Sequence, residues 1–173
     1  MSLRLSIANS VARCDMRVIV TVMTRILFQA GEAAALVGIT ANQLREWTGR
    51  RAIVSPDVPG RGRGKHALFS PTTVLVLRIV AELQTRFLME VGALGAMASR
   101  LGAELADVPF MALYGRAVSM TGCDEYEIIG LPRARIVASA VIIPFDPHLV
   151  AIAESCGSRD QPAQFQLFPA VNA

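Results

Sequence analysis

The chain has 173 residues, of which 53% are hydrophobic and 18% are charged, with a net charge of +3. This length and composition allow one or two small domains with a buried core and exclude a disordered tail as the main part of the chain. Cys14, Cys123 and Cys156 form no CxxC pair, so neither a zinc knuckle nor a disulfide framework is indicated. The apolar run 18–23 is too short to span a bilayer and no signal-peptide layout is present, so we expect a cytoplasmic protein without a membrane contact.

The basic residues are concentrated in the centre of the chain. Residues 41–66 hold six basic and two acidic residues, a net charge of +4, whereas residues 101–173 hold four arginines and eight acids, a net charge of −4. A polyanion would be attracted to the first region and repelled by the second.

The first 25 residues receive no predicted role, and the first predicted element follows them. Apolar residues at i, i+3, i+4 and i+7 predict a helix over residues 29–37, which Gly38 would end in the left-handed conformation. Thr40 can cap a second helix, in which Leu44 and Trp47 share one face. Two short helices with so tight a turn predict a helix-turn-helix.

A segment rich in glycine, proline and basic residues follows the second helix. Residues 53–54 and 67–69 are predicted as short strands of a hairpin whose tip carries Arg61, Arg63 and Lys65. Beside a helix-turn-helix, such a hairpin is a wing; the alternative is a flexible linker.

Two further helices are predicted. Ser70 and Pro71 have the types of an N-cap and first residue of a helix that continues to about Arg86. Its polar residues form one narrow stripe that we expect in water: Arg78, Glu82, Thr85 and Arg86. The next helix is predicted from about Met89 to Leu101, with Leu94, Met97 and Leu101 facing the core.

Several short motifs in this region resemble the MerR-family winged helix-turn-helix domain. They are "FQAGEAAALVGIT", "LREW", "IVSP" and "ALFSP" followed by an apolar helix with Leu-Arg-Ile, and together they cover about Ile26 to Leu101. The resemblance implies a double-stranded DNA-binding protein, commonly a homodimer on a near-palindromic site, that regulates transcription. A contact with RNA polymerase is a further partner that this role allows.

The resemblance also assigns roles to individual residues. Asn42 and Gln43 have the amides to pair with adenine edges, and Arg45 could reach a guanine or a phosphate. Trp47 would hold the recognition helix on the core, and the wing would contact phosphates or the minor groove. The predicted DNA-contacting residues are Thr40, Asn42, Gln43, Arg45, Arg50, Arg51, Arg61, Arg63, Lys65 and His66.

The sequence departs from the family pattern at four places. Glu46 stands where the family has a tyrosine, residues 48–49 include a one-residue insertion, and Ala67 replaces the wing arginine. Pro109 follows soon after the fourth helix and no heptads come after it, so the coiled coil that pairs subunits in the family is not predicted.

Beyond Pro109 the pattern changes to short apolar segments. "MALYGRAVSM", "EYEIIG" and "RIVASAVIIPF" are predicted as strands, with a tight turn at residues 114–116. Asp146 is predicted to cap a last helix, and His148 has no evident partner in the sequence. Cys123 with its acidic neighbours is interpreted as a solvated loop rather than a metal site.

The predicted fold is mainly α. It has an N-terminal extension (1–25), a winged helix-turn-helix domain (26–103), a small α+β module (104–156) and a tail (157–173). No catalytic motif and no cofactor or metal site is predicted. The leading function is a sequence-specific transcriptional regulator. The alternatives are an excisionase-like architectural protein of a phage or mobile element, and a small-ligand receptor that uses the C-terminal module. In the tail, Leu167 and Phe168 either fold back onto the module or, in the sharper interpretation, form a peptide that docks on the replication sliding clamp.

Overall fold

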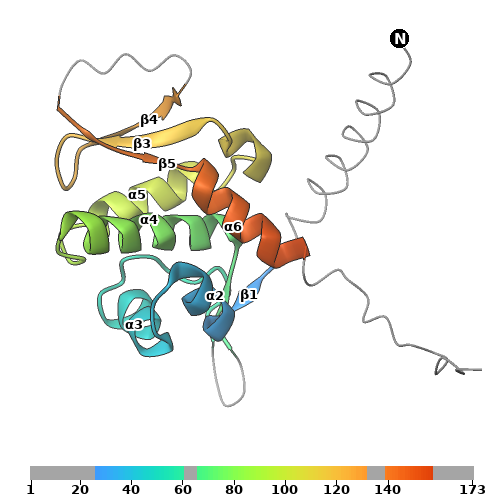
Figure 1. Ribbon diagram of the computed structural model, residues 1–173. Helices are drawn as coiled ribbons and strands as arrows, with labels where there is room; N and C mark the ends of the chain where they lie inside the picture. Colours follow the sequence, from blue (N-terminus) through green and yellow to red (C-terminus); the bar gives the residue numbers. More distant parts are fainter. Residues whose placement is uncertain (1–25, 61–65, 132–138, 158–173) are drawn as a thin grey trace, which may run out of the picture.

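The structure, a computed structural model, describes residues 26–60, 66–131 and 139–157. A long helix, α4, runs through the middle of the molecule; α2 and α3 lie on one side of it, and α5 and a small sheet lie on the other (Figure 1). The predictions for residues 1–25, for Arg61, Arg63 and Lys65, and for the tail from residue 158 fall outside the described residues. In chain order the elements are β1 (Phe28–Gln29), α2 (Ala30–Val37), α3 (Ala41–Arg45), the π-helix η1 (Glu46–Arg50), β2 (Leu68–Phe69), α4 (Pro71–Phe87), α5 (Gly95–Leu105), the 3-10 helix η2 (Phe110–Leu113), β3 (Arg116–Met120), β4 (Tyr126–Gly130), β5 (Val141–Pro144) and α6 (Asp146–Gly157).

The two predicted helices of the helix-turn-helix are confirmed. Gly38 ends α2 with a φ of 81°, a left-handed conformation that costs glycine little. Thr40 then caps α3: its hydroxyl accepts from the Gln43 N–H at 3.2 Å, and the Gln43 side chain accepts from the Thr40 N–H at 2.9 Å. This reciprocal capping box satisfies donors at the helix start and fixes the turn between the helices.

The chain after α3 makes a wider helical turn. In η1 the Arg51 N–H donates to the carbonyl of Glu46, five residues back, at 3.0 Å. Such a turn holds one residue more than an α-helical turn, which fits the insertion noticed at residues 48–49. Trp47 is buried within η1, and Ile53 is buried just beyond it.

The strand pairing after η1 differs from the prediction. Ile53 and Val54 are not a strand: both are core residues, and the Ile53 N–H donates to the Trp47 carbonyl at 2.9 Å. Leu68 instead pairs with Gln29 of β1 and forms an isolated bridge with Val58. The apolar pair was misassigned because burial at a helix end and burial in a strand leave the same short apolar signal.

Helix α4 begins as the sequence predicts, with Ser70 as cap and Pro71 as first residue, and the Thr73 N–H donates to the Ser70 hydroxyl at 3.2 Å. The predicted solvent stripe is partly wrong. Arg78 and Glu82 are only partly exposed, because α6 packs against α4. A second packed face of α4 was therefore hidden behind two polar residues that both bond to His148 of α6.

Helix α5 starts later and ends later than predicted. Residues 91–94 form a turn that still buries Val91 and Leu94, and the helix proper covers Gly95–Leu105. The predicted inward residues Leu94, Met97 and Leu101 are all fully buried. The apolar spacing thus gave the correct face, but it did not separate the turns from the helix.

The C-terminal part contains a three-stranded antiparallel sheet in the order β4-β3-β5. The predicted strand residues 111–114 are wrong, because Phe110–Leu113 form a 3-10 helix after Pro109. Gly115 has a φ of 71° and makes the predicted tight turn into β3. Part of the third predicted strand, residues 132–138, lies outside the described residues, and β5 covers only Val141–Pro144.

Helix α6 joins the C-terminal part to α4. The predicted cap is wrong: the Phe145 carbonyl accepts the first helical N–H bonds, and the Asp146 carboxylate accepts from the Gly115 N–H at 2.7 Å instead. Buried residues from both parts form one continuous cluster, from Phe28 through α4 to Ile152. The helix-turn-helix and the sheet are therefore carried on a common core.

Candidate nucleic-acid interface

The start of α3 presents a polar surface that is held from below by two buried side chains. Thr40, Asn42, Gln43 and Arg45 are exposed, whereas Leu44 and Trp47 are 1% and 3% exposed. Residues three and four apart share a helix face, so burial of the Leu44 face directs the remaining side chains outward. The structure thus brings the first four predicted DNA-contacting residues together on one short surface, which we call the α3 face.

Hydrogen bonds within the α3 face limit what each side chain has free. The Gln43 Oε1 atom accepts from both the N–H and the hydroxyl of Thr40, at 2.9 and 3.0 Å. Asn42 Oδ1 accepts from Arg45 Nη1 at 3.2 Å. The Gln43 oxygen therefore accepts two hydrogen bonds and the Asn42 oxygen one, a detail that the sequence did not indicate. An adenine edge requires an acceptor and a donor together, so Gln43 could pair with it only if its bonds to Thr40 opened.

Charge is distributed unevenly behind the α3 face. Glu46 Oε1 and Arg51 Nε form an exposed ion pair at 2.9 Å, so the carboxylate that departs from the family pattern offsets one of the predicted contact arginines. Arg50 lies beside this pair and is exposed. Arg45 and Arg50 are thus the cations of α3 and η1 that no carboxylate neutralises among the described residues.

The remaining predicted contacts lie near β2. His66 is exposed and precedes the partly buried Ala67. Arg61, Arg63 and Lys65 belong to a stretch that is not described, so the structure does not test their assignment.

A comparison with protein-family models identifies this region. Residues 28–89 match the model described as MerR HTH family regulatory protein. These residues are therefore similar to the helix-turn-helix domain of the MerR family. The matched segment runs from β1 to just beyond the end of α4 and contains every residue of the α3 face. No curated protein and no solved structure matches the chain.

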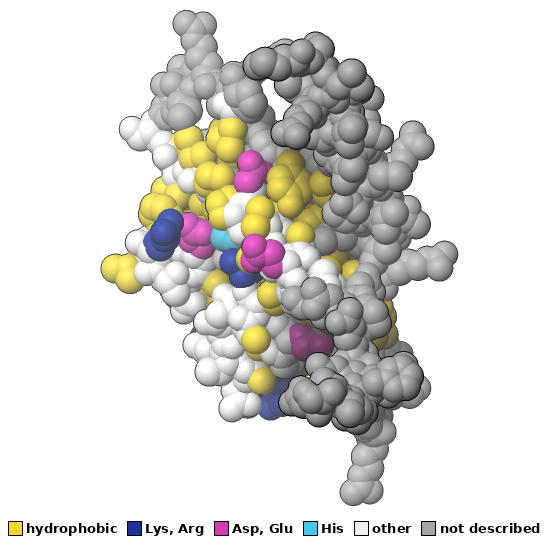
Figure 2. All heavy atoms as spheres, turned by 45° about the vertical axis from the view of Figure 1, so that its right-hand side comes forward, with side chains coloured by type: hydrophobic (Ala, Val, Ile, Leu, Met, Phe, Trp, Pro, Cys, Tyr) yellow, Lys and Arg dark blue, Asp and Glu magenta, His cyan; other side chains and the backbone are white. Residues whose placement is uncertain are grey.

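The MerR-type segment is anchored to α6 by a polar cluster that the sequence analysis missed. His148 is 6% exposed, and its Nε2 atom lies 3.0 Å from Glu82 Oε2. The Arg78 Nε–H donates to His148 Nδ1 at 3.3 Å, and Arg78 Nη1 also donates to the carbonyl of Leu36 at the end of α2. We call Arg78, Glu82 and His148 the α4–α6 clamp. Figure 2 shows a histidine between basic and acidic side chains on this face.

The clamp sets the protonation state of its histidine. Burial, followed by the neighbouring Arg78 guanidinium, lowers the pKa of His148 below the ordinary value of 6.5, and Glu82 opposes this shift. A neutral imidazole that accepts at Nδ1 and donates from Nε2 satisfies both partners. Burial also lowers the pKa of Arg78, against the opposing effect of Glu82. The sequence placed Arg78 and Glu82 on a stripe expected in water, and nothing local indicated that Arg78 has a partner 70 residues away.

The surface and the helices of the MerR-type segment suit a DNA-binding regulator. The family match supports DNA binding and regulation of transcription through a helix-turn-helix. Within the described ranges, none of the helices has the length and apolar character that crossing a membrane requires.

Proposed function

We propose that the protein is a sequence-specific double-stranded DNA-binding regulator of transcription that places α3 in the major groove. The α3 face carries the proposal: exposed amide donors and an arginine lie on a short helix that is fixed from below by Leu44 and Trp47. A major groove about 12 Å wide admits one α-helix, and its base edges are read by such groups.

The wing and a second copy of the chain complete the proposal. Val58 and Leu68 bridge at 3.0 and 3.1 Å and bring together the two chain segments that flank residues 61–65. Arg61, Arg63 and Lys65 would then contact phosphates beside the helix, together with His66, Arg50 and Arg51. Two copies on a near-palindromic site would double these contacts, and RNA polymerase would be reached from the bound dimer.

The test is the selection of bound genomic fragments, followed by affinity measurements at several salt concentrations. A compact, recurring sequence would support a regulator. Replacing Arg61 and Arg63 together by alanine should weaken binding to every sequence. It should also lower the slope of log affinity against log salt by about 1.8, at about 0.9 per lost phosphate contact. Arg116→Ala is the matched control, because Arg116 is exposed on β3, and it should leave the slope unchanged. An unchanged slope in the double variant would remove the wing from the interface.

One observation favours a second candidate, an excisionase-like architectural protein. After α5 the described chain turns at residues 106–109 into η2 and the sheet, and no long helix projects from residues 26–60, 66–131 or 139–157 as a dimer arm. A footprint separates the two functions: a regulator protects one compact operator, whereas an architectural protein loads several adjacent copies and bends the site.

A further inference from the structure

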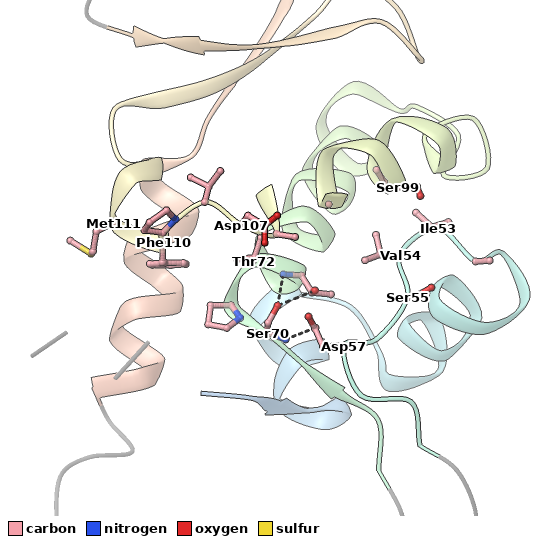
Figure 3. Close-up of a pocket in the computed structure, with 18 residues that line it drawn as sticks. Ile53, Val54, Ser55, Asp57, Ser70, Thr72, Ser99, Asp107, Phe110 and Met111 are labelled. Atoms are coloured by element: carbon pink, nitrogen blue, oxygen red, sulfur yellow. Dashed lines mark hydrogen bonds between the residues drawn. The ribbon is translucent and has the colours of Figure 1, made fainter. Parts of the chain in front are cut away.

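A cavity of about 630 Å³ lies between the MerR-type segment and the elements that follow it. Its walls come from residues 52–55 and Asp57 after η1, residues 70–73 at the start of α4, one side of α5, and residues 106–111 (Figure 3). Small-molecule sites in proteins commonly have volumes of about 300–1,000 Å³ and a largely apolar lining with a few polar groups. This cavity has the size and the mixed lining of such a site.

The charged side chains that line the cavity, among the described residues, are acidic. Asp57 and Asp107 line it, and the described part of its lining contains no lysine, arginine or histidine. Hydroxyl groups of Ser55, Thr72 and Ser99 add neutral hydrogen-bonding positions. An anionic ligand would find no cation among these lining residues, whereas a cation would be attracted by both carboxylates.

The two carboxylates differ in what they already bind. Asp57 Oδ2 accepts from the Ser70 N–H at 2.7 Å and so stabilises the start of α4, where the helix dipole is positive (Figure 3). Asp107 is exposed and makes no hydrogen bond or ion pair to any residue in the described part of the chain. Asp107 is therefore the group available to a ligand.

The apolar part of the lining is placed next to this carboxylate along the chain. Phe110 and Met111 follow Asp107 by three and four residues and line the same cavity, together with Pro71 and Ile53. An aromatic ring and a thioether adapt to a flat or flexible apolar body, and an aromatic face also attracts a cation.

We propose that this cavity binds a small organic ammonium compound, with its charged nitrogen at Asp107 and its apolar body against Phe110 and Met111. An ammonium group donates up to three hydrogen bonds, which suits one carboxylate and the neighbouring hydroxyls. The site uses none of the residues of the α3 face.

The position of the cavity connects it to DNA binding. Its walls include Asp57 and Ser70, which flank the segment that contains the Val58–Leu68 bridge. A ligand that binds one arrangement of this segment more tightly than another would change DNA affinity by that difference in binding free energy. This second step rests on the proposed function, and the binding site itself does not.

Binding is tested with 2-phenylethylamine as the probe and phenylacetate as a probe of opposite charge, each titrated into the full chain and followed by NMR chemical shifts. Gly102→Leu blocks the cavity: Gly102 lines it, and a Cβ atom there meets no other atom within 4 Å. Leucine also favours a helix more than glycine, so this variant keeps the fold. Gly95→Leu is the matched control, since Gly95 is also in α5, has the same open space and is outside the lining.

Saturable shifts with the amine, binding of phenylacetate at least about tenfold weaker, and loss of amine binding in Gly102→Leu but not in Gly95→Leu are expected. Asp107→Asn should weaken amine binding about tenfold, as expected for the loss of one charge-assisted contact. Absence of saturation at millimolar amine, equal binding of the two probes, or unchanged binding in Gly102→Leu would overturn the site. An amine that binds but leaves DNA affinity unchanged would overturn the coupling alone.

Discussion

The molecule has two polar clusters, the α3 face and the α4–α6 clamp, which use similar residue types for different purposes. On and behind the α3 face, the polar bonds join residues three to five positions apart: Thr40 with Gln43, Asn42 with Arg45, and Glu46 with Arg51. In the α4–α6 clamp, Arg78 reaches His148 across 70 residues and Leu36 across 42 residues. The first set is local and exposed, and the second is long-range and largely enclosed.

This difference separates recognition from architecture. Exposed local pairs contribute little to stability, because water competes with each partner, so their side chains can be exchanged for DNA contacts at low cost. An enclosed cluster leaves unpaired groups behind when one member is lost, so it ties three helices together. Variants in the clamp should therefore change stability, and variants on the α3 face should change DNA binding.

The largest expected effect comes from breaking the clamp at its centre. Arg78→Ala removes the donor to both His148 and the Leu36 carbonyl, while Glu82 keeps its contacts with Arg86 and His148. We expect the free energy of unfolding to fall by about 2–3 kcal/mol, below the full cost of a broken buried pair because Arg78 is only partly enclosed. Urea denaturation measures this loss.

Arg45→Ala is the comparison on the α3 face. Its bond partner Asn42 is exposed, so the free energy of unfolding should change by less than about 0.5 kcal/mol. Equal losses in the two variants would contradict the division between recognition and architecture.

The same contrast explains how much of the fold the sequence predicted. Around Thr40 and Ser70, hydroxyl caps, glycine and helical spacing lie within a few residues of one another, and the elements there were predicted correctly. Ile53 and the clamp depend on contacts between distant segments, and both were misread. Short-range chemistry is visible in one sequence, whereas a partner 70 residues away is not.

A change of pH should weaken the clamp without any substitution. Burial holds the pKa of His148 below its unfolded value of 6.5, so the unfolded chain binds this proton more readily than the folded chain. Stability from this group is fully present above about pH 6.5 and is lost as the pH falls towards the folded pKa. The loss is about 1.4 kcal/mol for each pKa unit between the two states. Melting temperatures measured between pH 7.5 and about pH 5 test this slope.

The control for this titration is His148→Gln. Its amide keeps an acceptor and a donor for Arg78 and Glu82 but does not titrate. The wild type should lose more stability than this variant on acidification, since other groups titrate equally in both. Parallel curves would show that the histidine is not responsible.

On the α3 face, Gln43 offers a sharper test of base recognition. Because its Oε1 atom is held by Thr40, its NH₂ group alone is free, and a single donor should discriminate by about 1 kcal/mol rather than by the range of about 1–3 kcal/mol for a bidentate pair. Gln43→Ala should therefore relax preference at one base position by about this amount. Competition binding with single-base variants of the selected site measures it.

The matched variant for this position is Gln43→Glu. A glutamate keeps the capping acceptor, since this position of a capping box takes either residue, but it loses the amide donor. The expected result is unchanged thermal stability together with lost base preference. Retained preference in both variants would place base recognition elsewhere on the chain.

Only part of the α3 face could be predicted from the sequence. Its residues and their exposure follow from the helical spacing around Leu44 and Trp47. The occupied amide oxygens and the Glu46–Arg51 pair do not follow from it, because they depend on rotamers that spacing does not determine. The sequence thus predicted which residues form the α3 face, but it could not predict which of their hydrogen-bonding groups are free.

The smallest expected effect concerns an exposed residue that belongs to neither polar cluster. Leu88 follows α4 with a φ of 54°, and its side chain is 87% exposed. A left-handed conformation costs a residue with a Cβ atom about 1–2 kcal/mol. Glycine avoids this cost, but it also makes the unfolded chain more flexible, which offsets part of the stabilisation. We therefore expect Leu88→Gly to raise the free energy of unfolding by about 0.5–1 kcal/mol. Leu88→Ala keeps the strain and should leave stability nearly unchanged, since little apolar area of Leu88 is buried. If glycine instead lowers stability, and does so more at high protein concentration, the Leu88 side chain is buried between two copies of the chain, and the end of α4 belongs to a dimer interface.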